Sequence, residues 1–122
     1  MSDISFVILY VDSPAKSAAF YADLLGRPAI EASPTFAMFS MKSGVMLGLW
    51  SRHTVEPAAT GMGGGELCFA VADDAAVRAA YADWGKRGLR VAQAPVALDF
   101  GFTFVALDPD GHRLRVFAPA AA

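Results

Sequence analysis

The chain has 122 residues, of which 55% are hydrophobic and 18% charged, and its formal net charge is −2 at pH 7. This composition excludes a disordered chain, and ten scattered basic residues exclude the electrostatic footprint of a nucleic-acid-binding protein. No apolar run approaches the roughly 18 residues of a membrane-spanning helix, and the single cysteine, Cys68, has no partner for an internal disulfide. We therefore expect one cytoplasmic domain that binds neither membrane nor nucleic acid, with Cys68 as a small core residue.

The first half of the chain is predicted to form one strand, one helix and three further strands. Ile4–Val11 is an unbroken run of β-branched and aromatic residues, which is typical of a strand. Asp12-Ser13-Pro14 is a helix-start signal, Ala15–Leu25 has apolar residues at helical spacing, and Gly26 ends the helix. The three shorter strands are predicted at Arg27–Ala32, Phe36–Met41 and Val45–Trp50.

The second half repeats this order after a loop. Residues 51–65 are rich in glycine and contain Glu56-Pro57, which indicates a linker. A strand at Glu66–Val71 and a helix at Ala75–Arg87 are followed by strands at Val91–Val96, Phe102–Leu107 and Arg113–Phe117. The two helices even share sequence, Phe20-Tyr21-Ala22-Asp23-Leu24 against Ala80-Tyr81-Ala82-Asp83-Trp84. The chain is therefore predicted to be an α+β protein with two βαβββ units in tandem.

The last predicted hairpin contains an unusual arginine. Its turn, Asp108-Pro109-Asp110-Gly111, combines a proline that presets φ with a glycine that accepts positive φ. In the strand that follows, Arg113, Arg115 and Phe117 alternate with aliphatic residues, so one face is charged or aromatic. An arginine at the centre of a strand is rarely buried without a partner, so the face that carries Arg115 is either exposed to solvent or part of a functional site.

The tandem plan resembles the glyoxalase/bleomycin resistance/extradiol dioxygenase superfamily, also called the vicinal oxygen chelate superfamily. The resemblance rests on Leu9-Tyr10-Val11 before the first helix, Leu25-Gly26 at its end and the Asp108-Pro109-Asp110-Gly111 turn. It implies a single domain over residues 1–122, with repeat one at 4–50, a linker at 51–65 and repeat two at 66–118. It also implies that the two units form a half-barrel around a concave space, and that two chains pair as a homodimer.

Enzymes of this superfamily hold a metal ion with side chains on the first and last strands of each unit. The resemblance places Phe6, Gly48, Glu66 and Arg115 at these positions. Only Glu66 is a metal ligand, because Phe6 has no donor atom, Gly48 has no side chain and Arg115 repels cations. Since a divalent ion needs three or four protein ligands, we expect no metal, no other cofactor and no catalytic residue.

The chain is more similar to the antibiotic-binding members of the superfamily, the phenazine antibiotic resistance proteins. The segments that carry this similarity are Leu49-Trp50-Ser51, Ala82-Asp83-Trp84, Phe100-Gly101-Phe102-Thr103-Phe104, Asp108-Pro109-Asp110-Gly111-His112 and Arg115-Val116. Alternation along the strands then predicts a cavity of aromatic and sulfur surfaces. For two of the predicted ligand-binding residues, Phe102 and Phe104, the sequence does not determine which face of the strand they occupy. The full set is Phe6, Tyr10, Met46, Gly48, Trp50, Glu66, Phe102, Phe104, Arg115 and Phe117.

Two roles for Arg115 remain open. The guanidinium can bind a ligand carboxylate through two hydrogen bonds, or it can pair with Glu66 and fill the place of the metal as a structural plug. The function that follows is sequestration, without catalysis, of a small planar aromatic compound such as a phenazine antibiotic, with Trp50 as the stacking plane. The alternatives are a metal-dependent lyase, isomerase or dioxygenase of the same superfamily, and a fold relative without a ligand.

Overall fold

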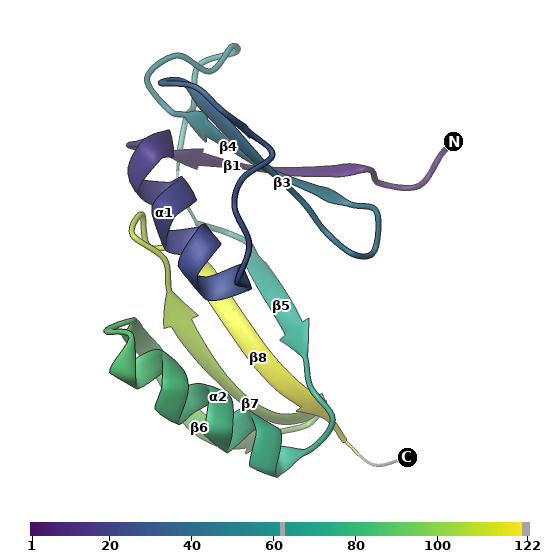
Figure 1. Ribbon diagram of the computed structural model, residues 1–122. Coiled ribbons are helices and arrows are strands. Elements are labelled where there is room, and N and C mark those ends of the chain that lie inside the picture. The colour runs from purple at the N-terminus through teal and green to yellow at the C-terminus, as the bar shows by residue number, and fades with distance from the viewer. Residues whose placement is uncertain (62, 121–122) are drawn as a thin grey trace. The chain divides into compact units, whose positions relative to one another are not determined.

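The computed structural model describes residues 1–61 and 63–120, and the chain divides into two compact units on either side of residue 62. Each unit contains one helix and one four-stranded sheet (Figure 1). The element order within each unit is strand, helix and three strands, so the predicted tandem α+β arrangement is confirmed. Neither helix in the described part of the chain is long and apolar enough to cross a membrane.

The first unit consists of β1 (Phe6–Val11), α1 (Pro14–Leu25), β2 (Glu31–Ala32), β3 (Phe36–Ser40) and β4 (Met46–Ser51). Its sheet has the order β1-β4-β3-β2, in which β1 runs parallel to β4 and the other neighbours are antiparallel. The helix begins where the Ser13 side chain accepts a hydrogen bond from the backbone of Lys16, and it ends at Gly26, whose φ is 70°. The α1 side of this sheet is the core of the unit, with Val11, Phe39 and Leu49 fully buried.

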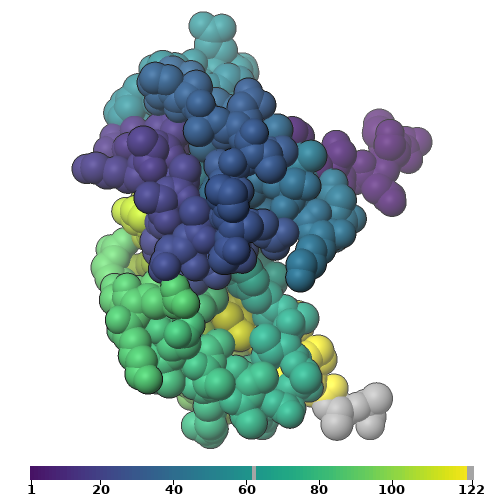
Figure 2. All heavy atoms as spheres, in the orientation of Figure 1, coloured from purple at the N-terminus to yellow at the C-terminus, as the bar shows by residue number. Residues whose placement is uncertain are grey.

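Two segments of the first unit differ from the prediction. β2 is much shorter than the predicted Arg27–Ala32 strand, because Pro28 has no N–H to donate to a neighbouring strand. The predicted linker begins in ordered structure: Val55 is buried, and its N–H donates to the carbonyl of Ser51 at 3.0 Å. The N-terminal residues before β1 extend away from the rest of this unit (Figure 2).

The second unit consists of β5 (Glu66–Ala70), α2 (Asp74–Lys86), β6 (Arg90–Leu98), β7 (Gly101–Leu107) and β8 (Arg113–Pro119). Its sheet has the order β5-β8-β7-β6, in which β5 and β8 are parallel. The Asp73 side chain caps α2 by accepting a hydrogen bond from the N–H of Ala76 at 2.8 Å. α2 lies along one face of the sheet (Figure 1), and Trp84 packs there edge-on against Phe69 and Phe104.

The Asp108 turn joins β7 to β8 as the sequence predicts. The Asp108 carboxylate is buried and accepts hydrogen bonds from the backbone N–H groups of Asp110 at 2.9 Å and of His112 at 2.8 Å. The turn pairs Leu107 with Arg113, and this register continues to the end of the hairpin. The turn therefore determines which β8 side chains share a face with which β7 side chains.

Candidate functional site

The first unit leaves one face of its sheet open, on the side opposite α1. On β1 this face carries Phe6, Ile8 and Tyr10, whose exposed fractions are 39%, 40% and 37%. On β4 the register places Met46, Gly48 and Trp50 beside them. The predicted common face of Phe6, Tyr10, Met46, Gly48 and Trp50 is therefore confirmed.

Aromatic rings cover part of this open face. The Phe36 ring lies 6.3 Å from the Trp50 ring, edge-on, and 6.5 Å from the Phe6 ring. Both phenylalanine rings extend over Gly48, where an added Cβ would lie 3.0 Å from a carbon of each. Gly48 thus allows the two rings to approach the backbone of β4, and together with Trp50 they form an apolar surface of the kind on which planar molecules stack.

The second unit also has an open sheet face, opposite α2. Neighbouring strands place on it Glu66 and Cys68 from β5, and Arg113, Arg115 and Phe117 from β8. The predicted face assignment of these residues is confirmed. Cys68 is exposed here, so the expectation of a core cysteine is wrong. The cause is its position on β5, where the residues on either side of it, not Cys68 itself, point toward the helix.

An ion pair between Arg115 and Glu66 is the central feature of this face. Arg115 Nε donates to Glu66 Oε1 at 2.7 Å, and the two side chains are 14% and 30% exposed. Arg115 Nη1 also donates to Thr103 Oγ1 at 3.1 Å, and the buried Thr103 hydroxyl itself donates to the carbonyl of Val116 at 2.8 Å. In the structure Arg115 therefore pairs with Glu66, as the structural-plug interpretation requires. Its guanidinium is held by Glu66 on one side and by Thr103 on the other.

This ion pair changes the acid–base properties of its neighbours. The hydrogen bond from Arg115 holds the pKa of Glu66 below its usual value, against the opposing effect of partial burial. Such a carboxylate is fully ionised at neutral pH and is a poor general base. Partial burial of the sulfur, and then the negative charge of Glu66, raise the pKa of the Cys68 thiol, whose Sγ lies 3.7 Å from Glu66 Oε1. Cys68 is therefore a neutral thiol at pH 7 and a weak nucleophile.

Three adjoining pockets lie along this face. One of about 280 Å³ is lined by Glu66, Cys68, Phe100, Arg115 and Phe117, and we call it the aromatic pocket. Phe100 contacts Phe117 edge-on with centroids 6.1 Å apart, and the Arg115 guanidinium carbon lies 5.4 Å from the Phe100 ring centre. This combination of two rings, a thiol and a fixed ion pair provides stacking surfaces and few polar groups, as small-molecule sites do.

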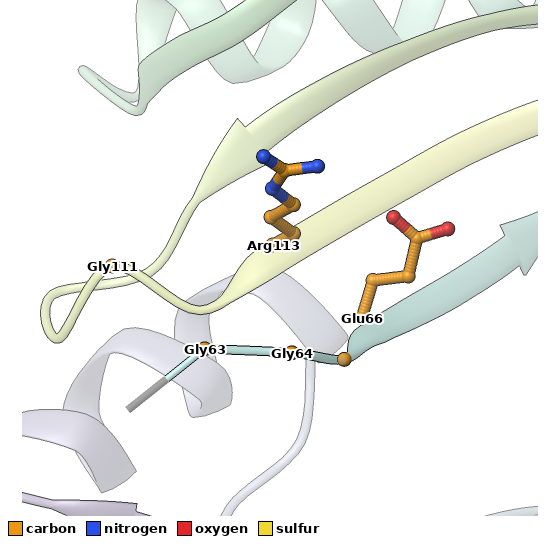
Figure 3. Close-up of a pocket in the computed structure, with 6 residues that line it drawn as sticks. Gly63, Gly64, Glu66, Gly111 and Arg113 are labelled. Atoms are coloured by element: carbon orange, nitrogen blue, oxygen red, sulfur yellow. The ribbon is translucent and has the colours of Figure 1, made fainter. Parts of the chain in front are cut away.

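The other two pockets share residues with the aromatic pocket. One of about 470 Å³ lies between the Gly63–Gly65 segment and Gly111, and Figure 3 shows Glu66 and Arg113 extending into it from adjacent strands. The second, of about 170 Å³, is lined by Ala92, Gln93, Val105, Arg113 and Arg115. Glu66 and Arg115 thus border the aromatic pocket and one further pocket each.

Two of the predicted ligand-binding residues lie on the wrong face. Phe104 is fully buried beneath α2, with its ring 5.3 Å from those of Tyr81 and Trp84. Phe102 lies on the same side, with the guanidinium of Arg78 from α2 stacked over its ring at 4.7 Å. The expectation that Phe102 and Phe104 line the concave surface is therefore wrong, because the hairpin register gives that surface to Thr103 and Val105 instead.

The donor set does not fit a resident metal ion. Phe6 and Gly48 supply no ligand atom, and the carboxylate of Glu66 is bonded to Arg115. Within residues 1–61 and 63–120, no group of three or more His, Cys, Asp and Glu side chains could hold a metal ion. We therefore derive no chemical step through a metal at these positions.

Sequence reasoning missed three residues of the second unit's open face, which are Gln93, Thr103 and Val105. For Thr103 and Val105 a signal existed, because a turn that pairs Leu107 with Arg113 also pairs Val105 with Arg115 and Thr103 with Phe117. Phe100 directly precedes β7, where the sequence predicts a residue of the cavity rim, and its ring lies against Phe117 in the aromatic pocket.

Comparison with known proteins supports this description. Residues 3–116 match the family model of the Glyoxalase/Bleomycin resistance protein/Dioxygenase superfamily. The phenazine antibiotic resistance protein EhpR of Enterobacter agglomerans is 26% identical over 112 residues, which cover 89% of this chain and 86% of that protein. The solution NMR structure of protein ATC0852 from Agrobacterium tumefaciens is 52% identical, with a TM-score of 0.91 and coverage of 99% of this chain and 100% of that one. A glyoxalase-related enzyme from Fulvimarina pelagi is 20% identical and shares the fold, with a TM-score of 0.83 and coverage of 100% and 94%.

Proposed function

Because the chain belongs to the glyoxalase/bleomycin resistance protein/dioxygenase superfamily, and because its donor set does not fit a metal, we propose that it binds a small planar aromatic compound without transforming it. A phenazine is the compound class that we favour, since one relative of the chain is a phenazine antibiotic resistance protein. Binding of this kind would sequester the compound and lower its free concentration.

The observation that carries the proposal is the state of Arg115. In an enzyme of this superfamily the position would supply a metal ligand, but here its guanidinium is held by Glu66 and Thr103. The fixed ion pair forms one wall of the aromatic pocket, whose remaining surface comes from Phe100, Phe117 and Cys68. A flat ligand gains contact area and edge-on or stacked ring contacts there, worth about 0.5–1.5 kcal/mol per aromatic pair beyond area burial.

Titration with phenazine tests the proposal directly. We expect saturable binding by isothermal calorimetry and a rise in the melting temperature, because a ligand at about 100 times its Kd stabilises the native state by about 2.7 kcal/mol. Phe117→Ala is expected to weaken binding at least fivefold, because it removes one of the two rings of the pocket. Phe102→Ala is the matched control, since Phe102 lies on the helix side of the same sheet and its loss leaves the pocket unchanged.

Two results would overturn the proposal. Absence of binding by phenazine and by other fused tricyclic aromatics would remove its basis. Stoichiometric zinc, nickel or iron in the purified protein, or recovery of a chemically changed ligand by mass spectrometry after incubation, would instead support the metal-dependent lyase, isomerase or dioxygenase. Tryptophan quenching by phenazine that disappears in Trp50→Phe would show that phenazine binds at the first unit's open face, since Trp84 lies in the core.

We also propose that the protein acts as a homodimer. The open face of β1 exposes more than a third of Phe6, Ile8 and Tyr10, and a second copy would cover this apolar surface. Light scattering coupled to size exclusion is expected to give twice the 12.8 kDa chain mass, and Ile8→Lys to give the single mass. A wild-type protein that elutes as a monomer at high concentration would refute this part.

A further inference from the structure

Thr103 is a buried polar side chain in an otherwise apolar strand. Its exposed fraction is 0%, and the remaining residues of β7 are glycine, alanine, phenylalanine, valine and leucine. A buried hydroxyl needs hydrogen-bond partners, and that of Thr103 donates to the Val116 carbonyl at 2.8 Å. Because its single hydrogen is used there, Oγ1 is left to accept, and it accepts from Arg115 Nη1 at 3.1 Å. This hydroxyl therefore connects the backbone of β8 to a side chain of the open face.

The Glu66 carboxylate lies beside two arginines of the neighbouring strand. Register places Arg113 directly opposite Glu66, and Arg115 opposite Cys68. The pKa of Glu66 is lowered first by the hydrogen bond from Arg115 and, least of the causes, by the charge of Arg113, so both guanidinium groups act on the carboxylate. Glu66 Oε1 nevertheless bonds diagonally to Arg115 Nε at 2.7 Å, and Figure 3 shows Arg113 as a separate side chain.

A second anchor distinguishes Arg115 from Arg113. Nη1 of Arg115 donates to Thr103, and the guanidinium carbon lies 5.4 Å from the Phe100 ring centre. The Arg115 side chain is 14% exposed, whereas Arg113 is an exposed residue. A long side chain loses rotamer freedom when it forms an ion pair, and one that a second hydrogen bond already holds has less freedom left to lose. Glu66 therefore gains more by bonding to Arg115.

The choice of arginine decides the walls of two pockets. Glu66 lines both the aromatic pocket and the pocket of about 470 Å³ beside Gly111. With the carboxylate on Arg115, the aromatic pocket has a wall in which two opposite charges compensate each other. With the carboxylate on Arg113, the mostly buried Arg115 would lose its partner, which is costly for a charged group. The shape and the charge of the surface that receives a planar ligand would then both change.

We propose that Thr103 is a positioning residue of the binding site. By holding Nη1 of Arg115, its hydroxyl directs the Glu66 carboxylate to Arg115 instead of Arg113, and so keeps the neutral wall of the aromatic pocket in place. Thr103 acts through Arg115 and needs no contact with the ligand. The consequence for ligand binding rests on the proposed function, whereas the choice between the two arginines can be tested without a ligand.

Arginine side-chain NMR distinguishes the two pairings. The rate of exchange with water is measured for the Nε–H protons of Arg113 and Arg115 in the wild type, Thr103→Val and Thr103→Ser. We expect the Arg115 proton of the wild type to exchange about tenfold more slowly than that of Arg113, because its Nε donates to the Glu66 carboxylate. Thr103→Val should reduce this difference to about threefold or less, and Thr103→Ser, which keeps the hydroxyl, should retain it.

Removal of the competing arginine separates positioning from a merely structural role. We expect Thr103→Val to raise the Kd of phenazine about fivefold, because binding must then order two long side chains, and Thr103→Ser to leave it within about twofold. When Thr103→Val is combined with Arg113→Gln, the carboxylate should return to Arg115. The slow exchange and the phenazine affinity should then recover to within about twofold of the wild type. A packing defect at Thr103 would not be repaired by a change at an exposed arginine of another strand.

Thr54→Val provides the matched control. It makes the same hydroxyl-to-methyl change in the first unit, where Thr54 Oγ1 donates to the Ser51 carbonyl at 3.4 Å, and it should leave the exchange rates and the phenazine Kd unchanged. Slow exchange of the Arg115 proton in Thr103→Val, or no recovery in the double variant, would overturn the inference and leave the proposed function standing. Absence of phenazine binding by the wild type would overturn the proposed function, and the exchange rates would still decide the role of Thr103.

Discussion

The ion pair between Glu66 and Arg115 allows a quantitative prediction for Glu66→Gln. Exposed ion pairs contribute about 0.2–1 kcal/mol, whereas breaking a fully buried pair costs about 3–5 kcal/mol. The two side chains here are 30% and 14% exposed, and a hydrogen bond to a charged group contributes about 1.5–3 kcal/mol. We therefore expect Glu66→Gln to lower the free energy of unfolding by about 2 kcal/mol. For a chain of this length, that is a fall in melting temperature of roughly 8 °C.

The effect should depend on pH with a definite sign. The pKa of Glu66 is lower in the folded protein than its ordinary value of 4.5, so the pair stabilises the protein fully above that value. The contribution is lost as the pH falls through the lower, folded-state pKa, where wild-type Glu66 becomes protonated. Urea unfolding at pH 7 and along a series down to pH 3 is therefore expected to show the two proteins converging at the acid end.

A second ion pair of the same unit serves as the control for this prediction. Arg87 Nε lies 3.0 Å from Asp83 Oδ2 on α2, and those side chains are 37% and 56% exposed. Asp83→Asn should cost less than about 0.5 kcal/mol, as exposed helical pairs do. If Glu66→Gln costs no more than Asp83→Asn, or if its effect persists unchanged to pH 3, the assignment of Arg115 as a structural plug is refuted.

Three further predictions address the core, the glycines and the thiol. Phe104→Ala should lower the free energy of unfolding by about 3–5 kcal/mol, because it empties a fully buried site beneath α2; a loss below 1.5 kcal/mol in urea melts would contradict this. Gly48→Ala should lower the free energy of unfolding by about 1 kcal/mol, because the aromatic rings over Gly48 can move. Gly101→Ala should lower it by about 3 kcal/mol, because the φ of Gly101 is 148° and an added Cβ would overlap the Ala118 carbonyl. Equal melting temperatures of the two variants would refute this distinction. Cys68 should react with iodoacetamide at pH 8 more slowly than free cysteine, and faster after Glu66→Gln removes the charge that raises its pKa; mass spectrometry of a time course decides.

Most of the fold could be predicted because local signals coincide with the tertiary structure. The caps at Ser13 and Asp73 and the glycine at Gly26 mark real helix ends. Alternation also assigned the faces of β1, β4, β5 and β8, because each of these strands has one face against a helix and the other open. The strand predicted over Arg27–Ala32 is too long, because Pro28 has no N–H for a strand ladder and β2 begins only at Glu31.

The parity of β7 could not be predicted from its own residues. Both faces of Gly101–Leu107 carry large apolar residues, Phe102 and Phe104 on one and Val105 and Leu107 on the other. Hydrophobic alternation therefore gives no clear preference, and the prediction that Phe102 and Phe104 line the cavity is wrong. The information was present in the turn, because the Leu107–Arg113 pair determines the register of the whole hairpin. The faces of β6 are harder still to predict, because two register shifts in its pairing with β7 decide on which face Gln93 lies.

The choice of Arg115 over Arg113 as the partner of Glu66 could not be predicted from sequence patterns. Register makes Arg113 the neighbour of Glu66, and Arg115 the neighbour of Cys68. The carboxylate nevertheless bonds to Arg115, because the buried hydroxyl of Thr103 and the ring of Phe100 hold that guanidinium in reach from the other side. A choice between two arginines of the same strand thus depends on side chains contributed by β7 and by the residue before it. Because Arg115 is engaged in this way, its guanidinium and the Glu66 carboxylate together form one wall of the aromatic pocket.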